Sequence, residues 1–136
     1  FYYGGRILDA GLMPILEPEI DIRAEDKVDC ERILKDNLLE FLSGLDDGRQ
    51  VMLKLTPPEQ DDFYADVIAH PGVLRVVALS GGWSRDEACA RLARNHGLIA
   101  SFSRALLEGL QHDQSDEEFN ATLTASIDQV YEASAT

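Results

Sequence analysis

Short apolar runs alternate along the chain with longer stretches in which apolar residues recur at helical spacing. Four of these runs have the length of β-strands and lie at residues 12–16, 51–55, 74–79 and 98–102. Three of the four are nearly continuous in apolar character, which is typical of parallel strands covered on both faces. The alternation predicts an α/β fold whose parallel strands are joined by right-handed crossovers.

Helix start and stop signals occupy the stretches between the runs. The sequence predicts helices at residues 1–10, 24–43, 59–69, 84–95 and from 115 onward, with a short helical segment at 103–110. Ser84 with Glu87, and Ser115 with Glu118, are spaced as capping boxes. An apolar stripe on the last helix predicts packing against the core through Phe119, Leu123, Ile127, Val130 and Tyr131. We expect residues 1–136 to belong to one domain, because no linker separates the elements.

The acidic composition narrows the choice of partners. The 136-residue chain has 25 acidic and 12 basic side chains, and its formal net charge is −13. This charge opposes binding to a polyanion through general electrostatics, so we expect no nucleic-acid partner. An anionic ligand would instead need a few local cations or backbone donors.

Cysteine, histidine and hydropathy patterns indicate neither a metal nor a membrane. Cys30 and Cys89 fall within helical patterns, and the histidines share no motif, so we expect no disulfide, metal or other cofactor. The chain shows no apolar run of about 18 residues and no leader with a cleavage site. We therefore expect a cytoplasmic location and no membrane partner.

A single lysine interrupts the apolar run at residues 51–55. Strand alternation places Lys54 on the face opposite Leu53 and Leu55. Such a lysine can protect a sheet edge or pair with a buried acid. Apolar surroundings also favour the neutral amine, which can attack a carbonyl carbon and form an imine. This last interpretation makes Lys54 a candidate nucleophile.

Two carboxylates follow the first strand. Glu17 and Glu19 share the face of Met13 and Ile15 if the chain stays extended through Pro18. Acidic residues at this place are often only turn or helix-start residues. An imine-forming enzyme, however, needs carboxylates that move protons during dehydration and carbon–carbon cleavage. Glu17 and Glu19 are therefore candidate acid/base residues.

Small and basic residues follow the third and fourth strands. Ser80, Gly81 and Gly82 allow backbone N–H groups to turn toward an anion, although serine and glycine often form only a turn. Ser101 and Arg104 open the expected short helix at 103–110, so a guanidinium and a helix N-terminus can meet the same anion.

The pairing of these two features on consecutive strands predicts a phosphate site. In (β/α)8 TIM barrels, phosphate often binds at the loops after strands seven and eight, next to a short extra helix. This match numbers the strands of the chain as five to eight. The chain would then supply the last four βα units of a parallel barrel, with strands one to four absent.

Four segments resemble class I fructose-1,6-bisphosphate aldolase, particularly its bacterial branch. They lie, in order, at residues 11–19 (GLMPILEPE), 51–54 (VMLK), 78–82 (ALSGG) and 100–106 (ASFSRAL). The resemblance covers essentially the whole chain and implies the carboxyl-terminal half of a TIM-barrel aldolase. It implies reversible cleavage of fructose 1,6-bisphosphate into dihydroxyacetone phosphate and glyceraldehyde 3-phosphate, within glycolysis and gluconeogenesis and without a metal.

The resemblance also implies roles for individual residues. Lys54 matches the Schiff-base lysine, Glu17 the principal acid/base carboxylate, and Glu19 a neighbour that orients or protonates the lysine centre. The substrate and phosphate contacts match Ser80, Gly81, Gly82, Ser101 and Arg104. Ser103 replaces a glycine of the animal forms, and Tyr131 is not matched to their functional carboxyl-terminal tyrosine.

The family's site also uses residues that this chain lacks. They are an aspartate on strand one, a lysine on strand three, and a lysine and an arginine on strand four. The expected partners are thus a phosphorylated ketose and either the missing amino-terminal half or a second copy of the chain, as a homo-oligomer. Two alternatives stay open: an imine-forming aldolase for another sugar phosphate, and a non-catalytic half-barrel.

Overall fold

The computed structural model of the chain describes residues 1–136 as an α/β unit of five helices and four strands. The helices are α1 (Tyr2–Asp9), α2 (Lys27–Ser43), α3 (Ala65–Ile68), α4 (Arg85–Leu92) and α5 (Asp116–Ser134). The strands are β1 (Ile15–Leu16), β2 (Val51–Leu55), β3 (Val73–Ala78) and β4 (Leu98–Ala100).

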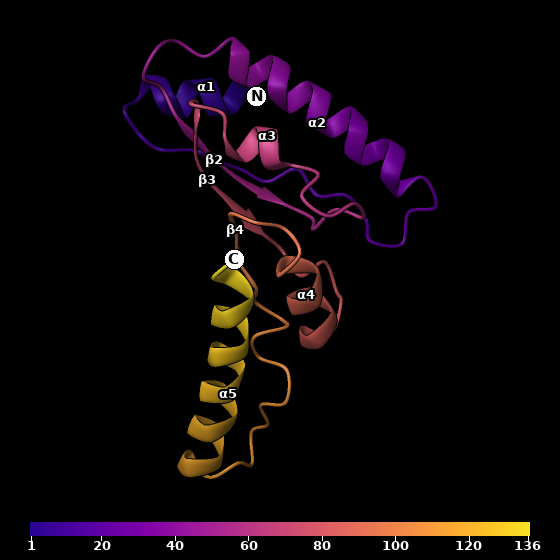
Figure 1. The fold of residues 1–136 in the computed structure, drawn as a ribbon. Coiled ribbons are helices and arrows are strands. Elements are labelled where there is room, and N and C mark those ends of the chain that lie inside the picture. The colour runs from indigo at the N-terminus through magenta and orange to yellow at the C-terminus, as the bar shows by residue number, and fades with distance from the viewer.

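All four strands are parallel and follow one another in the order β1-β2-β3-β4. Each connection carries a helix, and α2 and α3 lie together beside the sheet while α5 extends away from it (Figure 1). This order confirms the predicted α/β fold with parallel strands, and it is the order of four consecutive units of a barrel. The edge strands β1 and β4 each pair with one neighbour only.

The helices cover one face of the sheet. Val51, Leu53 and Leu55 of β2 are fully buried, whereas Met52 and Lys54, which alternate with them, are only half-buried. The buried side chains join one apolar core with residues of the helices, among them Leu38 and Leu42 of α2, Val67 of α3, and Ala88 and Leu92 of α4. Lys54 therefore points to the face of the sheet that the helices leave open.

The helix caps follow the sequence in part. At α5 the Ser115 hydroxyl accepts the Glu118 N–H at 3.2 Å, and the Glu118 carboxylate accepts the Ser115 N–H at 2.9 Å, which confirms that capping box. At α4 only half of the box forms. The Ser84 hydroxyl accepts the Glu87 N–H at 3.3 Å, but the Glu87 carboxylate pairs with Arg91 instead.

Two predicted helices are wrong in extent or in kind. The helix expected at 59–69 shrinks to Ala65–Ile68, because Asp62 takes a left-handed φ of 57° and accepts hydrogen bonds from the backbone and ring of His96. The helix expected at 103–110 is a series of turns. Its only i to i+4 bond joins Leu107 N–H to Ser103 C=O, and Gly109 leaves the helical region at φ 89°.

The predicted core stripe of α5 is wrong for three of its five residues. Tyr131 is 72% exposed, Ile127 48% and Phe119 40%, whereas the buried residues of the helix are Ser126 and Ala133. Small side chains face the unit because α5 packs closely against α4 and β4. Of the predicted stripe, Val130 packs against the core, whereas Phe119, Ile127 and Tyr131 face outward.

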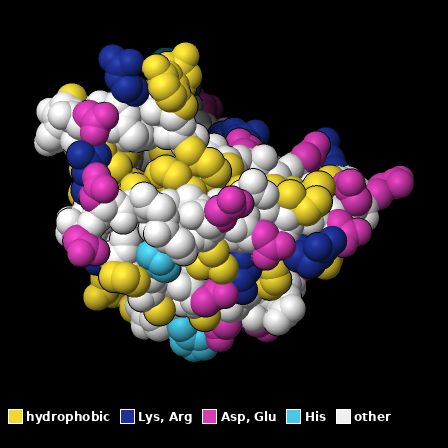
Figure 2. Space-filling view, turned by 90° about the horizontal axis from the view of Figure 1, so that it is seen from above, with side chains coloured by type: hydrophobic (Ala, Val, Ile, Leu, Met, Phe, Trp, Pro, Cys, Tyr) yellow, Lys and Arg dark blue, Asp and Glu magenta, His cyan; other side chains and the backbone are white.

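Apolar side chains remain on other surfaces as well. Met13 and Ile15, on the open face with Lys54, are 44% and 48% exposed. On the face that Figure 2 shows, hydrophobic side chains form a group near the middle, and acidic side chains lie around it. None of the five helices combines the length and apolar character needed to cross a bilayer.

Candidate functional site

A cavity of about 160 Å³ lies at the carboxyl ends of the four strands. Parallel strands deliver the residues that follow them to the same edge of the sheet. The lining therefore draws on all four strand ends: Glu17, Glu19, Lys54, Leu79, Ser80, Gly81, Ser101, Ser103 and Arg104. Every residue expected to contact substrate lines this cavity except Gly82, which is the next residue in the turn.

The centre of the cavity is an ion pair between strands β1 and β2. Lys54 Nζ donates a hydrogen bond to Glu17 Oε2 at 2.8 Å. The strand register explains the contact, because Leu16 is paired with Leu53 and each next residue continues on the open face. Lys54 cannot be an edge protector, since β2 has a partner on each side. Glu19 lines the same cavity one alternation beyond Glu17.

The serine–glycine turn after β3 requires its glycines. Gly81 and Gly82 have φ of 61° and 101°, in the region that favours glycine, and Trp83 N–H closes the turn on Ser80 C=O at 3.0 Å. A Cβ on Gly81 would lie 2.5 Å from Ile22 Cγ2. The turn therefore combines a left-handed backbone with tight packing against the β1–α2 loop.

Arg104 lies beside this turn. If Gly82 carried a Cβ atom, that atom would lie 3.9–4.0 Å from the two terminal guanidinium nitrogens of Arg104. Arg104 is exposed and forms no hydrogen bond or ion pair with the chain, so its donors remain available to a ligand. Because residues 103–110 form turns, the expected helix N-terminus does not contribute. An anion at this place would meet the Arg104 cation and the backbone of the glycine turn.

An ion cluster beneath the site was missed from the sequence. Lys27 and Glu31, which are 4% and 2% exposed, form an ion pair on α2, and Lys27 Nζ also contacts Glu59 Oε1 at 3.2 Å. Arg91 Nη1 contacts Glu59 Oε2 at 3.2 Å and its guanidinium lies 4.1 Å from the Trp83 ring centroid. The i, i+4 spacing of Lys27 and Glu31 was the one available signal, and it resembles an ordinary surface pair.

The cluster fixes the loop that follows Lys54. Lys27 Nζ donates to Pro57 C=O at 3.0 Å, and both Glu31 oxygens accept the Glu59 N–H at 3.2 Å. Burial alone would raise the pKa of Glu59, but hydrogen bonds from Arg91 and Lys27 outweigh it and hold that pKa below its ordinary value. The ion pairs and hydrogen bonds of the cluster thus connect α2, α4 and the β2–α3 loop.

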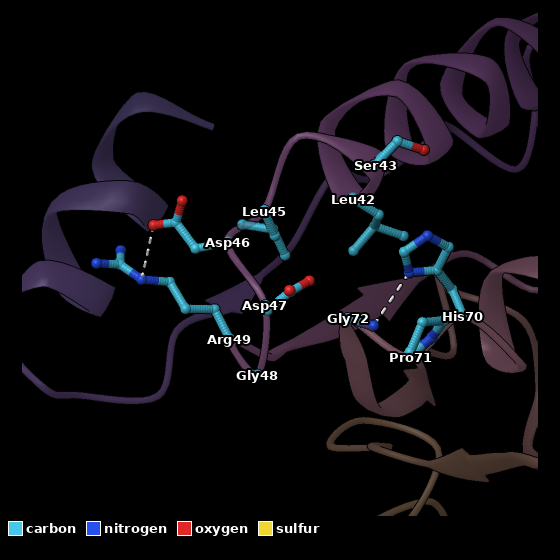
Figure 3. A pocket seen from close by; sticks show the side chains of 10 residues that line it. All are labelled: Leu42, Ser43, Leu45, Asp46, Asp47, Gly48, Arg49, His70, Pro71 and Gly72. Carbon is cyan, nitrogen blue, oxygen red and sulfur yellow. Dashed lines mark hydrogen bonds and ion pairs between the residues drawn. The ribbon is translucent and has the colours of Figure 1, made fainter.

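A second hollow, of about 220 Å³, lies at the opposite ends of the strands. Figure 3 shows that it is formed by the segments leading into β2 and β3, with Arg49 directed at Asp46 and His70 at Gly72. Two polar pairs form there: Arg49 Nε with Asp46 Oδ2 at 3.3 Å, and Gly72 N–H with His70 Nδ1 at 3.1 Å. We assign this hollow no chemistry. No group of three or more His, Cys, Asp or Glu side chains is placed to hold a metal ion.

Parallel strands with polar residues gathered at their carboxyl ends define the chain as a segment of a (β/α)-barrel type of protein. No family model matches the sequence. By its similarity to curated relatives along its whole length, however, the chain belongs to the class 1 fructose-bisphosphate aldolase family.

Three relatives carry this assignment, and each is named fructose-bisphosphate aldolase class 1. The chain is 55% identical over 136 residues to the one from Synechocystis sp. and 54% identical over 136 residues to the one from Clostridium acetobutylicum. It is 57% identical over 134 residues, 98% of its length, to the one from Porphyromonas gingivalis. The first two alignments cover 100% of the chain, but only 45–46% of each relative is matched. The chain thus spans a little less than half the length of these relatives.

Proposed function

We propose that this chain is the carboxyl-terminal half of a (β/α)8 aldolase, with its strands as strands five to eight of the barrel. In this proposal the complete protein cleaves fructose 1,6-bisphosphate reversibly into dihydroxyacetone phosphate and glyceraldehyde 3-phosphate. The observation that carries the proposal is the 2.8 Å contact of Lys54 and Glu17 inside a cavity that also holds the glycine turn and Arg104.

The first half of the reaction forms an imine on Lys54. Glu17 is placed to take a proton from the ammonium, since only the neutral amine attacks the ketone carbon. The resulting carbinolamine loses water when a carboxylic acid protonates its hydroxyl, and Glu17 or Glu19 supplies that proton. The positive iminium nitrogen then attracts the electrons of the neighbouring carbon–carbon bond.

The second half breaks that bond and restores the lysine. A carboxylate removes the proton of the C4 hydroxyl, the C3–C4 bond breaks, and its electrons form an enamine on the Lys54 side while the aldehyde leaves. Protonation of the enamine carbon and addition of water to the imine then release the ketone. Ser80, Gly81, Gly82, Ser101 and Arg104 hold the phosphate next to the ketone carbon throughout.

The remainder of the protein completes the site in this proposal. About half of a barrel leaves two open sheet edges, and the missing strands would supply further charged groups for the second phosphate and for proton transfer. We place the protein in the cytoplasm because its proposed reaction belongs to glycolysis and gluconeogenesis. The partner of the open face is the amino-terminal half of the barrel or a second copy of the chain.

A cleavage assay tests the proposal. The full-length protein should release both triose phosphates from fructose 1,6-bisphosphate, and Lys54→Arg should abolish release because arginine cannot form the imine. If the Lys54→Arg protein still cleaves the substrate, the proposed chemistry is wrong. The wild-type full-length protein should also be tested with other ketose phosphates, since an aldolase for another sugar phosphate would prefer one of them.

The 136-residue chain by itself tests whether half of the barrel can act alone. Borohydride trapping of a ketose phosphate separates the enzyme from a non-catalytic half-barrel. We expect it to show negligible cleavage at saturating substrate and to associate or unfold, because its open edges and apolar face lack partners. Its mass in solution and its turnover are measured on the same preparation. A stable monomer with an ordinary rate of turnover would contradict the half-barrel argument.

A further inference from the structure

The segment that carries both candidate carboxylates has almost no backbone support. Residues 17–20 form no hydrogen bond with any other backbone group. The strand β1 ends at Leu16, and the next helix begins at Lys27. Without another anchor, the carboxylate groups of Glu17 and Glu19 would move relative to Lys54.

One side chain supplies that anchor. The Thr56 hydroxyl accepts the Ile20 N–H at 3.0 Å and donates to the Ile20 C=O at 2.9 Å. These are the only hydrogen bonds made by the backbone of residues 17–20. Thr56 is 1% exposed, so water does not compete for its hydroxyl.

The position of this anchor matters for the chemistry. Thr56 follows Lys54 by two residues, directly after the strand that carries the nucleophile, and Ile20 directly follows Glu19. The loop continues to Ile22, which packs against Gly81 of the anion-binding turn. One hydroxyl therefore links the backbone of the nucleophile's strand to the backbone of the acid/base segment.

We propose that Thr56 is a positioning residue that sets the distance between Lys54 and the Glu17–Glu19 carboxylates. The proposal rests on the proposed aldolase function and adds to it a residue that touches no substrate. Removing the hydroxyl should affect steps that move protons more than the binding of substrate, because the phosphate contacts lie on the β3 and β4 loops.

The test compares three variants of the full-length protein. Thr56→Val keeps the shape but removes both hydrogen bonds, and Thr56→Ser keeps the hydroxyl. Ser126→Ala is the matched control, since the fully buried Ser126 hydroxyl also makes two bonds, donating to Thr122 C=O at 2.9 Å and accepting from Arg85 Nη1 at 2.8 Å. Ser126 lies on α5, outside the cavity.

We expect Thr56→Val to lower kcat at least tenfold and up to about 100-fold, the loss typical of a misplaced catalytic group. KM should change less than about twofold, because uniform binding is retained. Thr56→Ser should restore most of kcat, and Ser126→Ala should leave kcat unchanged even if both Thr56→Val and Ser126→Ala lower the melting temperature. Borohydride trapping on wild-type Lys54 is measured alongside.

The outcomes are separable. Suppose that the wild-type protein traps substrate on Lys54 but that Thr56→Val and Ser126→Ala have the same kcat. The positioning role is then wrong and the aldolase function stands. If the kcat of Thr56→Ser falls as far as that of Thr56→Val, the loss of the hydroxyl does not cause the fall in kcat, and the proposal is overturned. If wild type forms no adduct on Lys54, both proposals fail.

Hydrogen exchange keeps the proposal testable if Thr56→Val does not fold. In the wild-type full-length protein, the Ile20 amide should exchange more slowly than the amides of Glu19 and Asp21, which have no acceptor. Equal rates at the three amides would contradict the anchor directly.

Discussion

The buried ion pair of Lys27 and Glu31 should make an unusually large contribution to stability when only one partner is removed. Both side chains are at most 4% exposed, and neither can be solvated after its partner is lost. Removing one member of a buried pair typically costs about 3–5 kcal/mol, because the other charge stays buried and uncompensated.

The surroundings of the pair predict which substitution costs more. In Glu31→Leu, the Lys27 ammonium keeps its contacts with Glu59 at 3.2 Å and with Pro57 C=O at 3.0 Å. The free energy of unfolding should therefore fall by about 3 kcal/mol, the lower end of the range for broken buried pairs. In Lys27→Met, the Glu31 carboxylate keeps only the hydrogen bond from the Glu59 N–H, so the free energy of unfolding should fall by about 5 kcal/mol. The double variant should be more stable than Lys27→Met alone, since no unpaired buried charge remains.

Urea unfolding of the full-length protein measures these differences. The three variants and wild type are compared at neutral pH, with the midpoint and the slope recorded separately. Arg32→Met is a suitable control, because Arg32 pairs with Asp29 at 3.3 Å on the same helix but is 61% exposed. The free energy of unfolding of Arg32→Met should fall by less than about 1 kcal/mol, as for other surface pairs.

An order opposite to this one would refute the reasoning. If Glu31→Leu costs more than Lys27→Met, then Glu59 does not compensate the ammonium as its distance implies. If both single variants lose as little free energy of unfolding as Arg32→Met, the pair is solvated and the cluster does not hold these elements together.

Three further predictions concern the site and its supports. Arg104→Ala should weaken binding of the bisphosphate by about 1.5–3 kcal/mol with an unchanged melting temperature, because the exposed guanidinium has no partner in the chain. Gly81→Ala should cost at least about 1–2 kcal/mol of stability from its left-handed backbone, whereas Gly5→Ala in α1, with open space around it, should not destabilise. Because Glu59 has a lowered pKa, its contribution is present at neutral pH and is lost as pH falls below the ordinary carboxyl value of about 4.3, so Glu59→Gln should flatten the acid limb of a stability–pH curve.

Each of these has a contrary result. Normal bisphosphate affinity in calorimetry of Arg104→Ala would place the anion elsewhere. Equal melting temperatures for Gly81→Ala and Gly5→Ala would show that the turn relaxes. An acid limb that is equally steep in Glu59→Gln would mean that other carboxylates dominate.

Local patterns predicted the strand β2 and the cap of α5 because both depend on neighbouring residues. The bounds Val51–Leu55 follow from a short apolar run between turn residues, and the Ser115–Glu118 box forms within one helical turn. The gathering of Lys54 and Glu17 was also accessible, since parallel strands present their carboxyl ends together. The catalytic roles of these residues remain predictions that rest on the family.

Features that depend on distant residues could not be predicted. The helix at 59–69 is shortened by a contact of Asp62 with His96, which lies 34 positions away. The apolar stripe of α5 fits a core by its spacing alone, but α4 and β4 accept the small side chains of Ser126 and Ala133. The single sequence contains no signal for the approach of Glu59 to Lys27, which depends on how α2 crosses the loop after β2.

The most direct test of the account is where a reduced imine forms. The full-length protein is incubated with dihydroxyacetone phosphate, reduced with borohydride, digested and mapped by mass spectrometry. We expect one adduct, on the peptide that contains Lys54, and none in Lys54→Arg, because the neutral amine beside Glu17 is the proposed nucleophile. An adduct on another lysine, or an adduct that persists in Lys54→Arg, would contradict the assignment.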